Sequence, residues 1–358
     1  MCKIILVTIR NILLALIITL TSLFLTLLAS PIYLLRKCIF YIAPLVRPDL
    51  AKMLSTRSSA FAIDDTFNKP HFNGIVAWVL PTNNFPLEKI RQEFSSKILL
   101  AKNEQEKLIY PELQQTLTTW LGFSFWKPDK SFNLNDHIRL HPRSIEGTIT
   151  MDKSDNTKLF KKILNTPVPK GKCLWEIQVL WNYQSRNSDQ LKTMAIFKFH
   201  HALADAFSVL KLMSKGSDQN DLSTMAKPAQ IRRSFCYKFL TSIFFFIKVP
   251  YDLAKFMFLY DNNDWHKTEN AKHKGSLLGA YSDQIPLKDI KYICKSQQVC
   301  FSAVIGAVFT AAIRDTMAQQ RVKVPERVHC MAPFPYPNHP DHALRNHMCV
   351  QTKLALPN

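Results

Sequence analysis

Hydrophobic and polar positions follow different patterns along the chain, and the longest apolar run lies near the N-terminus. Residues 12–35 carry no charge over a length that matches the roughly 20 residues needed to cross a bilayer. A cleaved signal peptide competes, with Ala29 as the small residue near a cut, but the run is long and Pro31 disfavours cleavage. We therefore expect one N-terminal transmembrane helix. The basic residues around it lean weakly toward a cytosolic body.

From about residue 55 the pattern becomes that of a globular domain. A β-type run at 72–80 is followed by apolar residues at helical spacing between Pro86 and Ile98. Two strand-like runs, 173–181 and 191–199, flank a polar segment and predict an antiparallel pair. Strands and helices therefore alternate irregularly, which predicts a mixed α+β fold.

The second strand of that pair leads directly into a predicted helix that ends near Lys215 and Gly216. A helical repeat predicts that its inward-facing stripe comprises Leu203, Phe207, Leu210 and Met213. The last unit is expected to contain a small-residue helix at 301–317 and two strands, at 327–332 and 346–354.

Residues 235–260 are apolar but charged at intervals. Too few residues separate Lys238 from Lys248 to cross a bilayer, and Pro250 is expected to break the segment. A basic amphipathic stretch lying in the membrane interface fits this pattern. An ordinary core helix with snorkelling lysines fits it equally well.

The amino-acid composition excludes several classes of protein and of partner. Of 358 residues, 47% are hydrophobic and 20% charged, which excludes wholesale disorder and a polytopic membrane protein. Only 8 glycines occur, and no glycine-rich phosphate-binding motif is present, so a nucleotide-motif enzyme is not expected. The net charge of +19 indicates anionic partners: nucleic acid, an acidic membrane surface or a phosphate-bearing small molecule. Nucleic acid is not expected, because the aromatic residues lie in apolar runs without an interleaved basic stripe.

Cysteine usage points to the cytosol. The 8 cysteines are scattered without a C-x-x-C pair or zinc-like spacing, and the chain lacks an N-x-[ST] sequon. Both features suit a body that faces a reducing compartment.

The sharpest local signal is the sequence HHALADA at residues 200–206, placed at the end of an apolar strand. A neutral imidazole at His201, with a reference pKa of about 6.5, is suited to take a proton from a hydroxyl near pH 7. Asp205, in the first helical turn, is suited to fix the local backbone or a basic partner. A metal site is not expected, because adjacent histidines point to opposite sides of a strand. The structural alternative is a buried histidine pair satisfied by backbone groups.

HHALADA resembles the H-H-x-x-x-D-G motif of the wax ester synthase/diacylglycerol acyltransferase family, a branch of the CoA-dependent acyltransferases related to chloramphenicol acetyltransferase. Other segments agree in order. They are WKPDKSFNLNDHIRL (126–140), Leu174-Trp175-Glu176, the helix-loop-helix at 286–313 and the stretch from Asn346 to Pro357. The resemblance covers about residues 55–358, and its collinear order makes it more specific than any single motif.

The chain departs from the family pattern at several positions. The motif glycine is Ala206, the usual Asn-Asp pair is Ser302-Ala303, and the glycine before Asn346 is Arg345. Family members also continue beyond this point. We therefore expect an incomplete second lobe, as in a fragment, a splice product or a degenerate relative.

The resemblance implies a two-lobed α+β fold of the chloramphenicol acetyltransferase type, with a truncated second lobe. We expect a membrane anchor and flank at 1–50 and an N-terminal lobe with the HHxxxD motif at 55–215. A linker with the amphipathic interfacial segment is expected at 216–276 and a partial C-terminal lobe at 277–358.

The resemblance also implies direct transfer of a fatty acyl group from acyl-CoA to a lipid alcohol or diacylglycerol, in wax ester or triacylglycerol synthesis. His201 is implied to be the general base, with His200 in a supporting role and Asp205 holding the loop through an arginine. Ala206 and Asn346 are the expected substrate-binding positions. A non-catalytic, membrane-bound lipid-binding relative of the family is the alternative.

The expected partners are acyl-CoA as co-substrate, a lipid alcohol or diacylglycerol, and membrane lipids; no nucleic acid, metal or bound cofactor is expected. The expected location is the endoplasmic reticulum or plasma membrane, in a single-pass arrangement with the catalytic body facing the cytosol.

Overall fold

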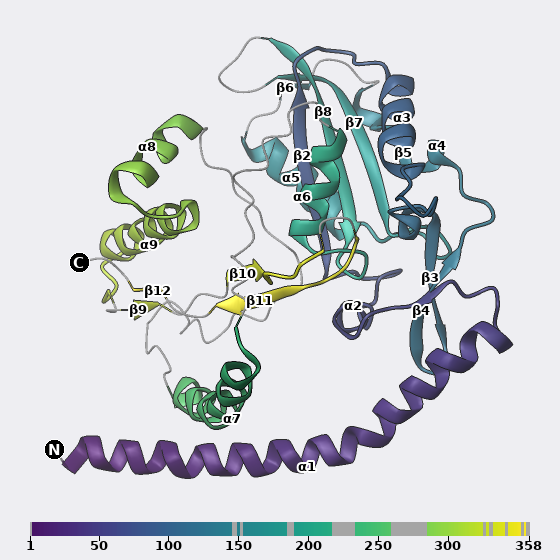
Figure 1. Cartoon of the computed structure of the whole chain (residues 1–358). Helices are drawn as coiled ribbons and strands as arrows, with labels where there is room; N and C mark the ends of the chain where they lie inside the picture. Colours follow the sequence, from purple (N-terminus) through teal and green to yellow (C-terminus); the bar gives the residue numbers. More distant parts are fainter. Residues whose placement is uncertain are drawn as a thin grey trace.

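In the computed structural model of the chain, a mixed five-stranded sheet forms the centre of the protein (Figure 1). The structure describes residues 2–144, 149–150, 153–184, 190–216, 233–258, 285–324, 327–328, 332–340, 343–351 and 354–355. The strands are β2 (Asn73–Leu80), β5 (Ile138–Leu140), β6 (Ile149–Thr150), β7 (Trp175–Gln184) and β8 (Leu191–His200).

Four of these strands lie in the order β2-β8-β7-β5, and β6 also pairs with β7. Strand β8 runs antiparallel to both neighbours, whereas β5 and β6 run parallel to β7. The predicted antiparallel pair and the mixed α+β class are thereby confirmed. Because β8 is central, every residue from Thr193 to His200 is buried, including the polar Thr193, Lys198 and His200.

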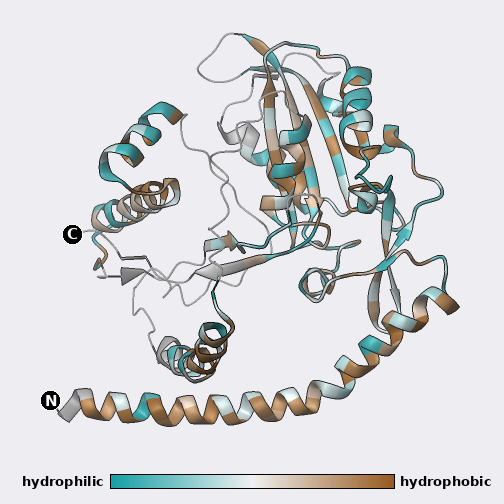
Figure 2. Cartoon of the chain, in the orientation of Figure 1, coloured by the Kyte–Doolittle hydropathy of each residue, from teal (hydrophilic) through white to brown (hydrophobic). Residues whose placement is uncertain are grey.

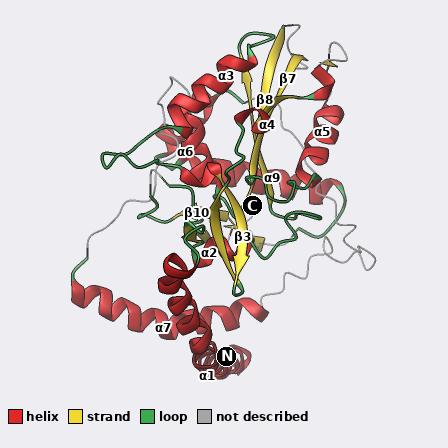
Figure 3. Ribbon diagram, turned by 90° about the vertical axis from the view of Figure 1, so that its right-hand side faces the viewer, coloured by secondary structure: helices red, strands yellow, loops and turns green. Residues whose placement is uncertain are grey.

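Helices cover both faces of this sheet (Figure 3). On one face lie α3 (Leu87–Phe94), continued by a π turn at Ser95–Leu99, and α6 (Ala206–Gly216). Their apolar side chains share the largest core with Trp175, whose ring stacks between those of Phe94 and Phe197. The other face is covered by α5 (Lys153–Asn165).

A smaller antiparallel sheet, in the order β1-β4-β3, lies beside the main one. Its strands are β1 (Lys52–Met53), β3 (Gln115–Trp120) and β4 (Phe123–Pro128). Short helices α2 (Thr56–Phe61) and α4 (Leu134–His137) and 3-10 turns at Pro111–Gln114 and Pro142–Ser144 connect these parts.

The C-terminal region contributes two helices and two short strand pairs. The helices are α8 (Leu287–Gln297) and α9 (Phe301–Gln319). The pairs are β9 (Arg327–Val328) with β12 (Leu354–Ala355), and β10 (Ala332–Pro335) with β11 (Met348–Gln351). Helix α9 confirms the predicted small-residue helix. Its residues Val308 and Phe309 are more than half exposed.

The predicted apolar N-terminal helix is present, but it is longer than the uncharged run. Helix α1 spans Cys2–Val46 and is apolar along most of its length (Figure 2). Two helices in the described residues, α1 and α9, are long and apolar enough to cross a membrane, by length and composition alone.

Two local predictions were wrong. Helix α7 runs without interruption over Phe235–Phe258, with Pro250 inside it, so this proline does not break the segment. Helix α6 begins only at Ala206, because residues 201–203 form a turn. Leu203 therefore precedes the helix, Leu210 is 39% exposed, and Val209 is among the residues that face the core.

Candidate active site

The histidine motif lies where β8 ends and the chain turns toward α6. The N–H of His201 donates to the carbonyl of Phe72 at 2.8 Å, and the N–H of Leu203 donates to the carbonyl of His200 at 2.9 Å. Main-chain bonds thus fix the turn that presents His201, as the strand-end prediction required.

The ring of His201 packs between two aromatic side chains. It stacks on Phe61, with ring centroids 5.3 Å apart, and meets Phe199 edge-on at 5.4 Å. Its Nδ1 is buried and has no hydrogen-bond partner among the described residues. Burial lowers the pKa of His201, while the main chain of Ala204 and the charge of Asp205 oppose that shift. The imidazole is therefore neutral at pH 7, which is the form that accepts a proton.

Asn346 binds the main chain of His201. Its buried side-chain amide donates to the carbonyl of His201 at 2.6 Å and to the hydroxyl of Ser58 at 3.1 Å. The structure thus brings Asn346 to the histidine motif but places its amide against the protein backbone. Ala206, the other expected substrate-binding position, is exposed at the first residue of α6.

His200 points away from its neighbour into a separate buried pair. Its Nδ1 accepts the N–H of Ala202 at 3.1 Å, so its proton sits on Nε2, which lies 3.1 Å from a carboxylate oxygen of Asp64. Burial lowers the pKa of His200, and the charge of Asp64 only partly offsets this. These contacts agree with a supporting role for His200.

Asp64 was missed from the sequence, although its buried carboxylate organises the loop behind His201. Besides His200, it accepts the N–H groups of His71 at 2.7 Å and Phe72 at 3.0 Å. Burial opposes its ionisation, but His200 and the two N–H groups outweigh burial and lower the pKa of Asp64 to about 2. Its local signal is weak, because an acidic residue in a polar turn rarely indicates a partner 136 residues away.

Asp205 links the start of α6 to the C-terminal region. Its carboxylate accepts the N–H of Ser208, as an N-cap does, and the N–H of His347, each at 2.8 Å. Nε2 of His339 lies 3.0 Å from the same carboxylate. The expectation that an arginine side chain holds Asp205 is wrong for the described contacts, because buried His339 occupies that position. Burial opposes ionisation, yet His339 and the N–H groups hold the pKa of Asp205 below its usual value.

Two cavities lie away from this turn, and neither is lined by His201. One, of about 220 Å³, lies around Trp175 and the buried ion pair of Lys198 and Glu176. The other, of about 480 Å³, lies between residues 102–109 and Lys215. In the part of the chain that the structure describes, no group of three His, Cys, Asp or Glu side chains is placed to hold a metal ion.

Comparison with known proteins decides the family. The model of the wax ester synthase/diacylglycerol acyltransferase catalytic domain matches residues 54–234, which include the strand end, the histidine motif and α6. The chain belongs to this family. Membership confirms the resemblance drawn from the sequence and, with it, the CoA-dependent acyltransferase type of fold. His339, Asn346 and His347, which hold Asp205 and His201, lie beyond the matched range.

Individual relatives are more distant. Wax ester synthase/diacylglycerol acyltransferase 3 of Arabidopsis thaliana is 30% identical over 139 residues, which are 37% of this chain and 23% of the relative. The chain thus matches less than a quarter of that relative's length. The wax ester synthase/diacylglycerol acyltransferase from Marinobacter aquaeolei VT8 is 14% identical, with a TM-score of 0.47, over 78% of this chain and 64% of that chain. The first condensation domain of the calcium-dependent antibiotic synthetase is 10% identical, with a TM-score of 0.47, over 85% and 70%.

Proposed function

We propose that the chain is an O-acyltransferase that moves a fatty acyl group from acyl-CoA to a lipid alcohol or diacylglycerol, forming a wax ester or triacylglycerol. The observation that carries this proposal is the imidazole of His201, held at a strand end by main-chain hydrogen bonds in a chain of this family. Acyl-CoA is the co-substrate, and some of the +19 charge suits its phosphates.

His201 acts as the general base in this proposal. It takes the hydroxyl proton as the alcohol oxygen attacks the thioester carbonyl, and it returns that proton to the CoA thiolate as the C–S bond breaks. Because Nδ1 is buried, Nε2 is the atom that receives the proton. His200 and Asp205 support this geometry through Asp64 and His339 rather than by touching the reacting atoms.

The protein works at a membrane in this account. Helix α1 supplies the attachment, and the body faces the cytosol at the endoplasmic reticulum or plasma membrane; a single pass is the arrangement predicted from residues 12–35. The division into an anchor (1–50), an N-terminal lobe (55–215), a linker (216–276) and a partial C-terminal lobe (277–358) belongs to the same proposal. Ala206 and Asn346 remain the sequence-predicted substrate positions, but the contacts of Asn346 favour a structural role.

A second candidate is a non-catalytic lipid-binding relative. Three departures from the family pattern favour it, namely Ala206, Ser302 and Ala303. This candidate predicts binding of acyl-CoA or lipid without turnover.

The test is acyl transfer by the full chain and by His201 variants. Wild-type protein in detergent is mixed with acyl-CoA and a long-chain alcohol, and both free thiol and ester are measured. We expect His201→Ala and His201→Gln to lower kcat by about 10²-fold or more, with melting temperatures near wild type. His200→Ala is the matched variant, and we expect it to lose stability as well as activity, because it removes the side-chain partner that His200 gives to the buried carboxylate of Asp64. Wild-type turnover by His201→Gln contradicts the base assignment, whereas acyl-CoA binding without wild-type turnover selects the lipid-binding candidate.

A further inference from the structure

Helix α1 lies along the body instead of leading away from it. At 1.5 Å per residue its 45 residues measure about 68 Å, roughly twice the hydrocarbon thickness of a bilayer. Its C-terminal turns are fixed to the small sheet: Ile39 and Ala43 are buried against Phe125. Arg36 also donates to the carbonyl of Leu54 at 2.5 Å. From this attachment the helix runs beneath the globular part to the N-terminus (Figure 1).

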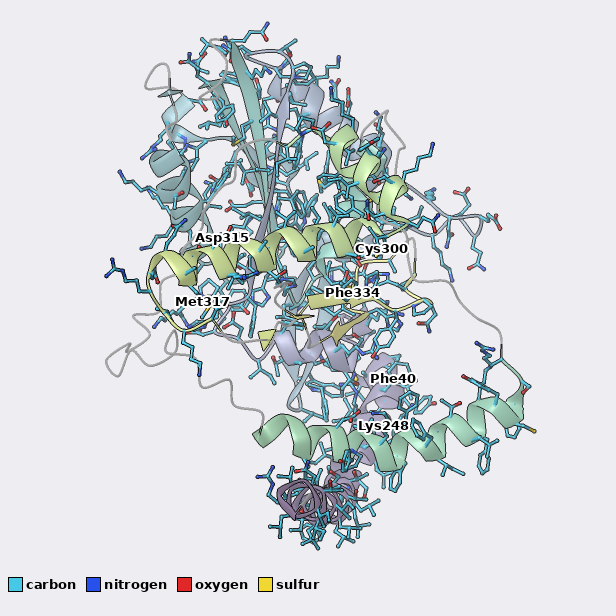
Figure 4. All side chains as sticks on the ribbon, turned by 90° about the vertical axis from the view of Figure 1, so that its left-hand side faces the viewer. Phe40, Lys248, Cys300, Asp315, Met317 and Phe334 are labelled. Carbon is cyan, nitrogen blue, oxygen red and sulfur yellow. The ribbon has the colours of Figure 1, made fainter. Side chains whose placement is uncertain are left out.

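Helix α7 crosses α1 and contacts it. Figure 1 views α7 nearly end-on and α1 lengthwise, whereas Figure 4 views α1 end-on and α7, with Lys248 labelled, lengthwise. The two axes therefore lie in parallel planes along the same side of the body. The crossing falls on the N-terminal half of α1, far from its attachment to the small sheet (Figure 1).

Apolar side chains of both helices are exposed. On α1 the exposed large hydrophobic residues include Leu16, Leu20, Phe24, Leu27, Leu28, Ile32 and Leu35. On α7 they include Phe235, Phe239, Leu240, Phe244, Phe245 and Phe246. The tip of the β3–β4 hairpin adds Leu121, 62% exposed, between Trp120 and Phe123, which pack beside the end of α1. An apolar surface of this extent is typical of a membrane contact.

The charged residues of α7 favour a position of this surface in the membrane interface over a crossing of the bilayer. Helix α7 carries Lys238, Lys248 and Asp252, and Lys248 pairs with Asp252. If α1 crossed the bilayer, α7 at its N-terminal half would carry these charges into hydrocarbon, where charged side chains are costly. In the interface the lysines meet anionic headgroups instead. Helix α1 contains no acidic residue, so the surface has the cationic and apolar character that an anionic leaflet attracts.

We propose that α1 and α7 form a monotopic platform that lies in one leaflet of an anionic bilayer. Both ends of α1 then stay on the same side of the membrane as the body. This arrangement replaces the single crossing predicted from the sequence. It does not depend on acyl transfer, so its test is separate from that of the proposed function.

The first experiment measures topology in microsomes. The full chain carries one epitope tag before residue 1 and another in the exposed loop at 103–106 of the body, and protease is added with and without detergent. We expect both tags to behave alike, being cleaved together without detergent. Opposite behaviour, with one tag protected until detergent is added, means that α1 crosses the bilayer and overturns the proposal.

The second experiment measures the role of charge on vesicles. Full-length protein is diluted from detergent onto phosphatidylcholine vesicles with or without phosphatidylserine, and flotation is measured. We expect Lys238→Glu with Lys248→Glu to weaken binding to the anionic vesicles by about tenfold, and high salt to weaken wild-type binding. The matched control is Lys288→Glu with Lys295→Glu, which makes the same charge change on α8 and leaves binding at the wild-type level. Equal binding by both double variants overturns the platform. Soluble oligomers that do not bind vesicles also overturn it, and they assign the apolar surface to self-association.

Discussion

Replacing Asn346 by alanine tests how the C-terminal region holds the catalytic turn. The change removes the donor to the carbonyl of His201 at 2.6 Å and to the hydroxyl of Ser58 at 3.1 Å, at a site that is 5% exposed. Each hydrogen bond contributes about 0.5–1.5 kcal/mol net, and a buried acceptor that loses its donor costs about 1–3 kcal/mol. We therefore expect the free energy of unfolding to fall by about 2–4 kcal/mol.

Activity should fall through kcat. The carbonyl that Asn346 binds belongs to His201 itself, so a loosened turn misplaces the imidazole relative to the thioester. A displacement of about 1 Å can cost about 10²-fold in rate. We expect kcat to fall to that extent while KM for acyl-CoA and for the alcohol changes little, because the amide faces protein groups.

Ser58→Ala is the matched partial change, since it removes only the 3.1 Å bond. It should cost about 1 kcal/mol and little activity. Denaturant unfolding gives the stability of each variant, and steady-state kinetics gives kcat and KM. A rise in KM with unchanged kcat and unchanged stability refutes this reasoning and gives Asn346 the substrate-binding role.

Three further predictions concern the surroundings of His201. The pKa of Asp64 is about 2, against an ordinary 3.8, so the ionised carboxylate stabilises the fold by about 2 kcal/mol above pH 4, and this stability is lost as pH falls from about 4 to 2. Asp64→Asn should flatten that part of the stability–pH curve, measured by denaturant unfolding. Gly74→Ala should destabilise by about 1–3 kcal/mol in thermal melts, because the new Cβ would lie 2.7 Å from the ring of Phe199, while a melt unchanged from wild type would mean that the ring moves freely. Because partial burial lowers the pKa of His201 below 6.5, kcat/KM should fall on the acid side with a midpoint below 6.5, and a midpoint above 6.5 would contradict this direction of the shift.

Local patterns were enough to predict the central strands. Strand β8 is buried from Thr193 to His200, so most of its residues up to the two histidines are apolar, with Lys198 as a buried exception. The same pattern placed His201 at a strand end, and the collinear motifs supplied the family.

The contacts that hold the motif could not be predicted in this way. Asp64 meets His200 across 136 residues, and His339 meets Asp205 across 134. Asp64 and His339 have no periodic or spacing signal in the sequence, because the formation of a single buried polar pair depends on how the chain folds in three dimensions. The stripe of α6 was misjudged for a related reason: the turn at 201–203 delays the start of the helix and shifts which residues face the core.

The prediction that Pro250 breaks the segment at 235–260 was wrong, because it used only the local preference against proline inside helices. Helix α7 continues through Pro250 and packs across α1. The uncharged run at 12–35 correctly predicted an apolar helix. Its length alone did not reveal that α1 extends to Val46 and docks on the small sheet through Ile39 and Ala43.

Isotope-labelled acyl transfer is the most direct test of the central claim. Membranes containing the full chain are supplied with acyl-CoA labelled in its acyl group and a panel of fatty alcohols, sterols and diacylglycerol, and the extracted lipids are analysed by mass spectrometry. The account predicts labelled ester in the wild-type sample for at least one acceptor, with a matching amount of free CoA, and at most about 1% of that ester with His201→Gln. Labelled ester formed equally by both proteins, or no labelled ester from wild type with any acceptor, would contradict it.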